Sequence, residues 1–317
     1  LPAIFLLLVG GRIVYHYAAE ITVKSAFYDS LGMGSAYDLR WRANVVLGVL
    51  GLLLAVLLAL PVLLMRWERQ RDRPAPGTAP PIEGIDWEDW PGLGRASQAA
   101  RRLDRRLVRL AVLGAFLITT LILVAILVPG LIAARDDFRA CVRARPFGVV
   151  DPVFGRDISF FVFVEPLIRT IVSLAAGALG VAAAAALLVG GGVWFVEKGA
   201  GAVRQADAVL ARALTAGFLL GGLFFAALGG LLWTSRYELV LSDGEVVAGA
   251  GAATRAIDIP TRTVGSGAMW IMAIGLIAMA FPQVRRAASR ISLRRAVQAG
   301  VSVWAVLALV LAVVASP

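Results

Sequence analysis

The chain has 317 residues, of which 59% are hydrophobic and only 16% are charged. A soluble domain of this length needs more charge to cover its surface, so the composition excludes an ordinary soluble protein and predicts lipid-facing helices. The formal net charge of +10 does not indicate nucleic-acid binding, because the basic residues gather between hydrophobic runs. We therefore expect membrane lipid, and no nucleic acid, as a partner.

Residues that carry catalytic or metal chemistry are scarce. Cys141 is the single cysteine and His16 the single histidine. A disulfide within the chain, a cysteine-built metal site, a multi-histidine site and a Ser/His/Asp triad with an exposed serine are therefore excluded. Acidic pairs such as Asp136-Asp137 would suit a divalent cation, but the neighbouring arginines favour ion pairs. We expect no cofactor, no metal and no enzymatic activity.

Hydrophobic runs of about 20 residues are long enough to cross a bilayer as helices. The sequence predicts an all-α bundle of seven spans, at about 1–20, 44–65, 109–129, 167–194, 213–233, 267–283 and 298–315. Small residues are abundant in 167–194 and 213–233, which predicts close helix contact there. The chain begins without Met and ends inside a hydrophobic run, so we expect both ends to be truncated.

The distribution of basic residues orients the bundle. Most of the lysines and arginines lie in one set of loops, namely the Arg-rich loop 66–108 and the loops 195–212 and 284–297. By the positive-inside rule these loops are cytoplasmic, and the loops 21–43, 130–166 and 234–266 are extracytoplasmic. The N-terminus is then cytoplasmic and the C-terminus extracytoplasmic. The excess of Arg over Lys, with much Ala and Gly, is typical of a GC-rich bacterial genome, so we expect the bacterial cytoplasmic membrane.

Ionisable residues in the first span form a stripe. Arg12, His16, Glu20 and Lys24 recur at steps of four, which places them along one side of a helix. Intramembrane charge often marks proton or ion movement, although pairing with charges on other helices is the ordinary explanation. His16 as an axial ligand of a pigment is a further alternative.

The two long extracytoplasmic loops carry β-like patterns. Ile158–Val164 is a run of Phe and Val that predicts a strand. Asp243-Gly244, between Tyr237–Leu241 and 246–247, predicts a hairpin turn. We expect Asp157–Val164 and Tyr237–Val247 to pack together as a small sheet. We also expect Arg156 and Arg236 to hold the carboxylates of the acidic residues in these segments, which are Asp151, Asp157 and Glu238.

These loops also resemble a known family. The run PFGVVDPVFGRDISFFVF and the later Tyr237-Glu238-Leu239, followed by glycines, resemble two signatures of Uncharacterised Protein Family 0182, a group of large bacterial membrane proteins. The resemblance implies seven spans followed by a large extracytoplasmic domain, and no established activity. It points to these site residues: Phe147, Gly148, Asp151, Phe154, Gly155, Asp157, Phe160, Tyr237, Glu238, Gly244, Gly249 and Gly251.

Two functions remain open at this point. One is a structural or interaction subunit of an envelope complex, which contacts other membrane subunits or an appended extracytoplasmic domain. The other is a transporter or channel that uses Arg12, His16 and Glu20. Transporters usually carry several polar groups at mid-membrane, whereas the later predicted spans hold almost none apart from Arg169. The sequence therefore favours the interaction subunit.

Overall fold

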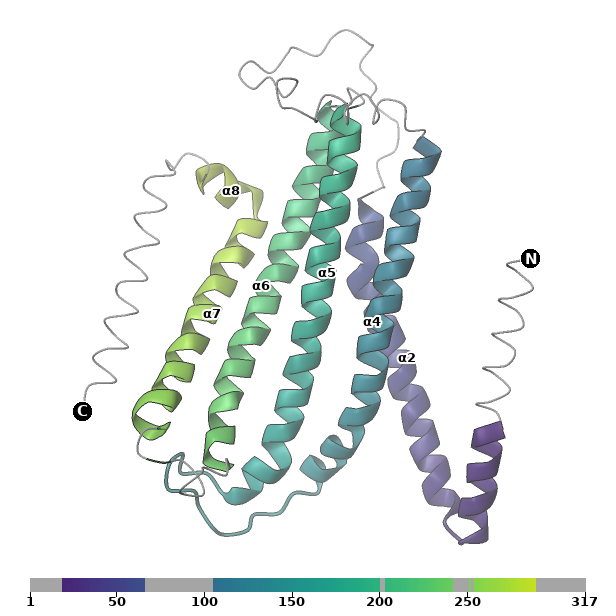
Figure 1. The fold of residues 1–317 in the computed structure, drawn as a ribbon, viewed down its shortest axis with the longest axis vertical. Helices are drawn as coiled ribbons and strands as arrows, with labels where there is room; N and C mark the ends of the chain where they lie inside the picture. The colour runs from purple at the N-terminus through teal and green to yellow at the C-terminus, as the bar shows by residue number, and fades with distance from the viewer. Residues whose placement is uncertain (1–18, 66–104, 200–202, 242–250, 252–253, 289–317) are drawn as a thin grey trace. The chain divides into compact units, whose positions relative to one another are not determined.

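The computed structural model describes residues 19–65, 105–199, 203–241, 251 and 254–288 (Figure 1). It divides the chain into two compact units, Leu1–Leu50 and Gly51–Pro317, and the contacts below lie within one unit or the other. The named helices are α2 (Gly34–Leu64), α4 (Arg105–Val142), α5 (Glu165–Gly199), α6 (Val203–Leu241), α7 (Ile259–Ala280) and α8 (Pro282–Ala288). Two π-helical turns, η2 (Phe160–Val164) and η3 (Thr254–Asp258), precede α5 and α7.

Five of the described helices are long and apolar enough to cross a membrane. They cover Gly34–Leu64, Arg106–Val142, Phe160–Lys198, Asp207–Val240 and Thr254–Ala280. Each of the five middle predicted spans falls on one of these helices. The span predicted at 267–283 runs past the end of α7, because Phe281 is extended (φ −82°, ψ 125°) before Pro282, as residues that precede proline usually are. The spans predicted at 1–20 and 298–315 lie outside the described residues, except for 19 and 20.

The predicted strands are wrong where the structure describes them. Ile158–Val164 opens the helix that continues as α5, and Tyr237–Leu241 is the last part of α6. Both runs continue directly from or into an apolar span. In lipid a helix satisfies its own backbone hydrogen bonds, whereas a short pair of strands leaves an open edge. The predicted turn at Asp243-Gly244 lies outside the described residues.

In the first unit, two helical segments are joined by a tight turn. Residues 19–30 are helical, Gly32 adopts a positive φ of 69°, and α2 begins two residues later. The rings of Tyr28 and Tyr37 stack across this turn with their centroids 5.1 Å apart. Glu20, which we expected in the polar stripe, forms an ion pair with Lys24, with 2.5 Å between Glu20 Oε1 and Lys24 Nζ. Both side chains are about half exposed.

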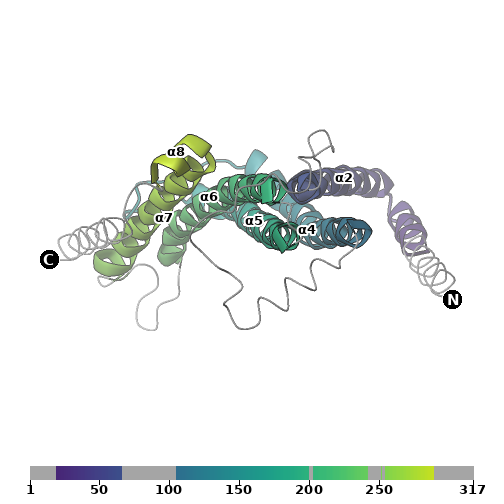
Figure 2. The same cartoon turned by 90° about the horizontal axis from the view of Figure 1, so that it is seen from above.

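The helices of the second unit pack mainly against their neighbours in the chain. α4 packs on α5, α5 on α6, and α6 on α7. Figure 2 shows these four helices following one another in a row. Among the described residues, most of each candidate span is left unburied.

Small side chains fill the seams between these helices. One buried cluster joins the second half of α2 to α4 and α5, and its members are Ala55, Ala59, Leu123, Leu127 and Ala178. A second joins α5 to α6, and its members are Met65, Ala182, Ala183, Ala186, Val209, Ala213 and Leu220. Small residues let helix backbones approach closely, and the gain in van der Waals contact holds helices together in lipid. The small-residue packing expected from the sequence is therefore present at the α5–α6 seam.

Candidate functional site

The family-like residues that the structure describes gather at one end of the second unit. Because successive helices run in opposite directions, the C-terminal ends of α4 and α6 and the N-terminal ends of α5 and α7 lie at the same end (Figure 1, lower part). We call this the signature end. It comprises the loop 143–157, the helical residues 158–164 that include the turn η2, the first turns of α5 and α7 and the last turns of α6.

Asp157 organises the loop by accepting hydrogen bonds from the backbone. Its carboxylate receives the N–H groups of Phe147 (3.0 Å), Gly148 (2.9 Å) and Ser159 (2.8 Å). One oxygen of Asp151 likewise receives the N–H groups of Val153 and Phe154, at 2.9 and 2.6 Å. Charge-assisted bonds of this kind are stronger than bonds between neutral groups. Both aspartates therefore hold the loop itself, and the expectation that arginines hold them is wrong.

The backbone of the loop doubles back on itself, with its two arms joined by backbone contacts. Val150 and Asp157 form an isolated antiparallel bridge, and Asp151 and Arg156 are joined by a 2.8 Å backbone hydrogen bond. Gly148 and Gly155 have positive φ angles of 73° and 63°. Residues with a side chain rarely adopt this conformation, so glycine is favoured at both positions. Residues of the first family-like motif thus determine the conformation of the loop. Two glycines form its turns, and two aspartates accept hydrogen bonds from its backbone amides.

The same contacts make the loop sensitive to acid. Hydrogen bonds from the hydroxyl and amide of Ser159, with smaller contributions from the amides of Phe147 and Gly148, lower the pKa of Asp157 from 3.8 to about 2. A depressed pKa stabilises the folded loop above pH 3.8, and this stabilisation is lost as the pH falls toward 2. We expect the hydrogen-exchange protection of the Phe147 and Gly148 amides, corrected for intrinsic rates, to fall over this window.

Asp157→Asn should remove that pH dependence, because the amide does not titrate. Asp38→Asn, at an exposed position on α2 in the other unit, is the control and should leave the loop's acid response intact. An Asp157→Asn variant whose loop amides keep the wild-type pH profile would show that another group controls the loop.

An aromatic cluster joins the two family-like segments. The ring of Tyr237 in α6 lies 4.8 Å from Phe154 in the loop, and 5.3 and 5.9 Å from Phe160 and Phe161 in η2, measured between centroids. Tyr237 and Phe161 are 5% and 2% exposed. Edge-to-face pairs at these distances stabilise beyond the burial of their surfaces. The two segments therefore do pack together, but as helices and a loop instead of a sheet.

The arginines expected to pair with the aspartates lie over these rings. The guanidinium carbon of Arg156 is 4.4 Å from the centroid of Phe160. Arg236 lies 3.2 Å from the centroid of Trp233, and its Nη2 donates to the Tyr237 hydroxyl at 3.1 Å. A planar guanidinium is attracted to an aromatic face, and the aspartates are already engaged by amides. These arginines consequently brace the aromatic cluster.

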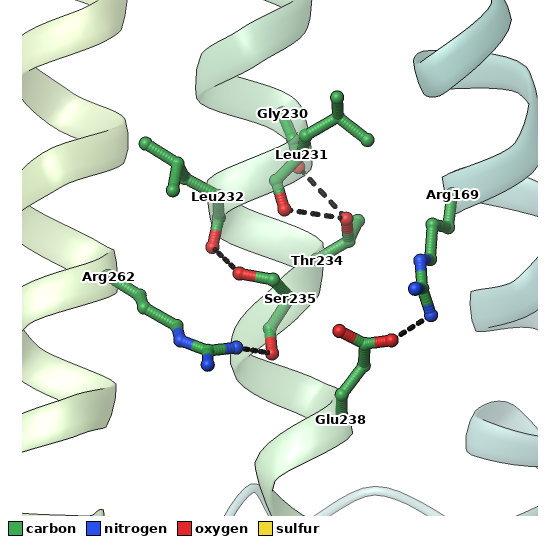
Figure 3. A network of polar contacts seen from close by, with 8 residues as sticks. All are labelled: Arg169, Gly230, Leu231, Leu232, Thr234, Ser235, Glu238 and Arg262. Atoms are coloured by element: carbon green, nitrogen blue, oxygen red, sulfur yellow. Dashed lines mark hydrogen bonds and ion pairs between the residues drawn. The ribbon is translucent and has the colours of Figure 1, made fainter.

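Polar contacts tie α6 to α5 and α7 beside this cluster (Figure 3). Arg169 of α5 forms an ion pair with Glu238 of α6. Arg262 of α7 donates to the backbone carbonyl oxygen of Ser235 in α6. Glu238, one of the family-like residues, is thus held by an arginine, though by Arg169 and not by Arg156 or Arg236.

Two polar residues in or near this network, Arg262 and Glu165, were not predicted as site residues from the sequence. Glu165 is 5% exposed and lies within the candidate span Phe160–Lys198, whereas the predicted span began at 167. Arg262 lies in the first turns of α7, a part of the chain assigned to a loop. The continuity of the apolar run from Ile158 onward was the available indication that the helix begins earlier.

The remaining predicted site residues are scattered or not described. Phe147 is half exposed, with its ring 5.7 Å from that of Phe163. The carbonyl of Gly251 accepts a 3.0 Å hydrogen bond from the Arg255 amide near η3. Arg12, His16, Gly244 and Gly249 lie outside the described residues.

Comparison with known proteins gives a family match over the whole chain. The model of the Uncharacterised protein family (UPF0182) matches residues 1–317. A UPF0182 protein of Synechococcus sp. (strain JA-3-3Ab) is 32% identical over 140 residues, which are 44% of this chain and 16% of that protein. A UPF0182 protein of Cupriavidus necator is 31% identical over 135 residues (43% of this chain, 14% of that protein). One of Saccharopolyspora erythraea is 28% identical over 242 residues (75% and 23%).

The matched regions make up less than a quarter of each of these relatives, so the chain is similar to a minor part of a longer protein. No solved structure matches the chain.

Proposed function

This chain belongs to the Uncharacterised protein family (UPF0182), and from that premise we propose that it is an integral membrane subunit of the bacterial envelope that acts through protein contacts at its signature end. Its partners are other membrane subunits or an extracytoplasmic domain. We propose no catalytic activity and no cofactor for the chain.

The observation that carries this proposal is the construction of the signature end. The loop 143–157 is fixed from within by Asp151 and Asp157, and Tyr237 of α6 contacts Phe154 of the loop and the Phe160 and Phe161 rings of η2. A surface that is rigid before binding loses little conformational entropy on association. Beside this fixed frame the loop exposes Phe147 and Val149, which are 52% and 55% exposed. Such a preorganised, partly apolar surface suits protein docking.

The arrangement of the helices supports the same proposal. α4, α5, α6 and α7 contact mainly their chain neighbours, through seams of alanine and other small residues. Between 17% and 28% of the residues in the most apolar window of each candidate span are buried. Among the described residues, most of the apolar surface of the spans is therefore open to lipid, to the rest of the chain or to neighbouring subunits.

We propose the topology that the sequence predicts: seven spans, a cytoplasmic N-terminus and the signature end outside the cytoplasmic membrane. The native Cys141, at the end of α4 and partly exposed, provides a probe. In intact cells a membrane-impermeant maleimide should label Cys141, and also Val149→Cys in a Cys141→Ser background. Cysteines placed at 70–105 in that background should react only after the cells are opened. Labelling of cysteines at 70–105 in intact cells would show that the proposed orientation is wrong.

The alternative function is a transporter or channel that uses Arg12, His16 and Glu20. Reconstitution in liposomes distinguishes it from the interaction role. We expect liposomes that contain the purified chain to show no proton, ion or solute flux above that of protein-free liposomes. We also expect Arg12→Ala and His16→Ala to leave native complexes of this protein intact on size-exclusion chromatography, and Asp157→Ala to reduce their yield. Robust flux that Arg12→Ala abolishes would refute the interaction role.

A further inference from the structure

One carboxyl oxygen at the signature end is buried without a hydrogen-bond partner. Glu165, in the first turn of α5, is 5% exposed. Its Oε1 is buried and makes no hydrogen bond. The residue lies inside the candidate span Phe160–Lys198, where ionised groups are costly.

The nearest arginine in the helix is already engaged. Arg169 lies one helical turn after Glu165, which places both side chains on the same side of α5. Its guanidinium, however, forms the ion pair with Glu238 of α6 that Figure 3 shows. Arg169 thus stands between two carboxyl groups and its Nη1 is paired with the one on the neighbouring helix.

Three charged groups of α4 at this end, Arg135, Asp136 and Asp137, have partners of their own; no contact of Arg139 with Glu165 is present. Arg135 holds Asp136 with its Nε and Nη2, both at 3.0 Å. Asp137 accepts a 3.3 Å hydrogen bond from the Thr170 hydroxyl.

The arginines of α6 and α7 at this end make other contacts. Arg236 lies over the ring of Trp233 and donates from Nη2 to Tyr237, although its Nε is buried without a hydrogen bond. Arg262 donates to the Ser235 carbonyl.

Removing a carboxylate from water without a compensating partner costs far more free energy than removing the neutral acid. We propose that Glu165 is a proton-binding site: the carboxyl takes up a proton from the aqueous phase and is a neutral acid in the folded protein. While Glu165 is protonated it does not compete for Arg169, so Arg169 stays paired with Glu238. This ion pair joins α5 to α6. Loss of the proton creates a second carboxylate one turn from Arg169, which competes with Glu238 for the guanidinium. Proton occupancy of Glu165 therefore sets the strength of the α5–α6 link.

Infrared difference spectroscopy of the full chain in lipid nanodiscs tests this directly. Carboxyl groups in water are ionised at neutral pH, so a carbonyl stretch of a protonated acid on the high-frequency side of the amide I band reports a buried neutral acid. We expect this band in the wild-type protein at pH 7 and its loss in Glu165→Gln. Glu197→Gln, the same change at the opposite end of α5, is the matched control and should keep the band. A wild-type protein without the band at pH 7, or a band unchanged in Glu165→Gln, would overturn the proposal.

Glu238→Gln tests the link to Arg169. Without Glu238 the guanidinium is free to pair with Glu165, which favours the ionised carboxylate. We expect the band of Glu238→Gln to disappear at a lower pH than that of the wild type. Identical pH profiles would show that Arg169 is not shared between the two carboxyl groups. These measurements need no binding partner and no flux assay, so their outcome is independent of the interaction role proposed above.

Discussion

Tyr237→Ala should lower the free energy of unfolding by about 3–5 kcal/mol, the usual cost of removing a large buried aromatic side chain. Tyr237 is 5% exposed and contacts Phe154, Phe160 and Phe161. Its loss removes the ring that α6 contributes to this cluster and opens a cavity between α6, the loop 143–157 and η2. Unfolding by a denaturing detergent in mixed micelles, followed by tryptophan fluorescence, measures the change.

Two further variants separate the causes. Tyr237→Phe keeps the ring and removes the hydroxyl that accepts from Arg236, which should cost about 1 kcal/mol. Phe138→Ala, at a 58% exposed position on α4, should change the stability by no more than about 0.5 kcal/mol. If Tyr237→Ala proves as stable as Phe138→Ala, the aromatic cluster does not join the two segments.

The spans could be predicted well because their cause is local. A run of about 20 apolar residues becomes a helix in lipid whatever its neighbours are, and the five middle predictions fall on candidate spanning helices. Boundaries were less predictable. The run Ile158–Val164 has β-branched and aromatic residues that suit a strand, yet it adjoins an apolar run and becomes the opening of a spanning helix. A short apolar run does not distinguish strand from helix by its periodicity alone.

The contacts within the candidate site were not predictable from the sequence. The glycines and aspartates of the first signature came from the family resemblance, and the turns and amide contacts that they form involve neighbouring residues in the chain. Which arginine meets which acid depends on helix packing. Arg169 and Glu238 come from different helices, and Arg236 had an aromatic ring within reach as an alternative to a carboxylate. Glu165 was missed for the same reason, since its burial follows from a helix boundary that was placed too late.

Gly222→Ala and Gly221→Ala should change the stability in opposite directions, although they are the same substitution at adjacent positions of α6. A Cβ at Gly222 would come within 2.6 Å of Ile277 Cγ1 and 2.9 Å of the Ala273 carbonyl oxygen in α7. A backbone oxygen of a packed helix yields only if the helices separate, so we expect a loss of about 1–3 kcal/mol. Loss of α6–α7 contact would also expose the seam that positions Arg262 beside Ser235.

Gly221 is the matched control because a Cβ there meets nothing within 4 Å. With no steric cost, alanine should raise the stability by up to about 1 kcal/mol, since glycine is the poorer helix former. The two variants are compared by thermal unfolding in the same detergent, with α6–α7 proximity followed by cross-linking of cysteines placed across the seam. Equal stability of the two would mean that α6 and α7 do not approach closely at Gly222. A loss confined to Gly222→Ala would show that the helices of the row are held together by close backbone contact, because no charge, hydrogen bond or large apolar side chain differs between the two variants.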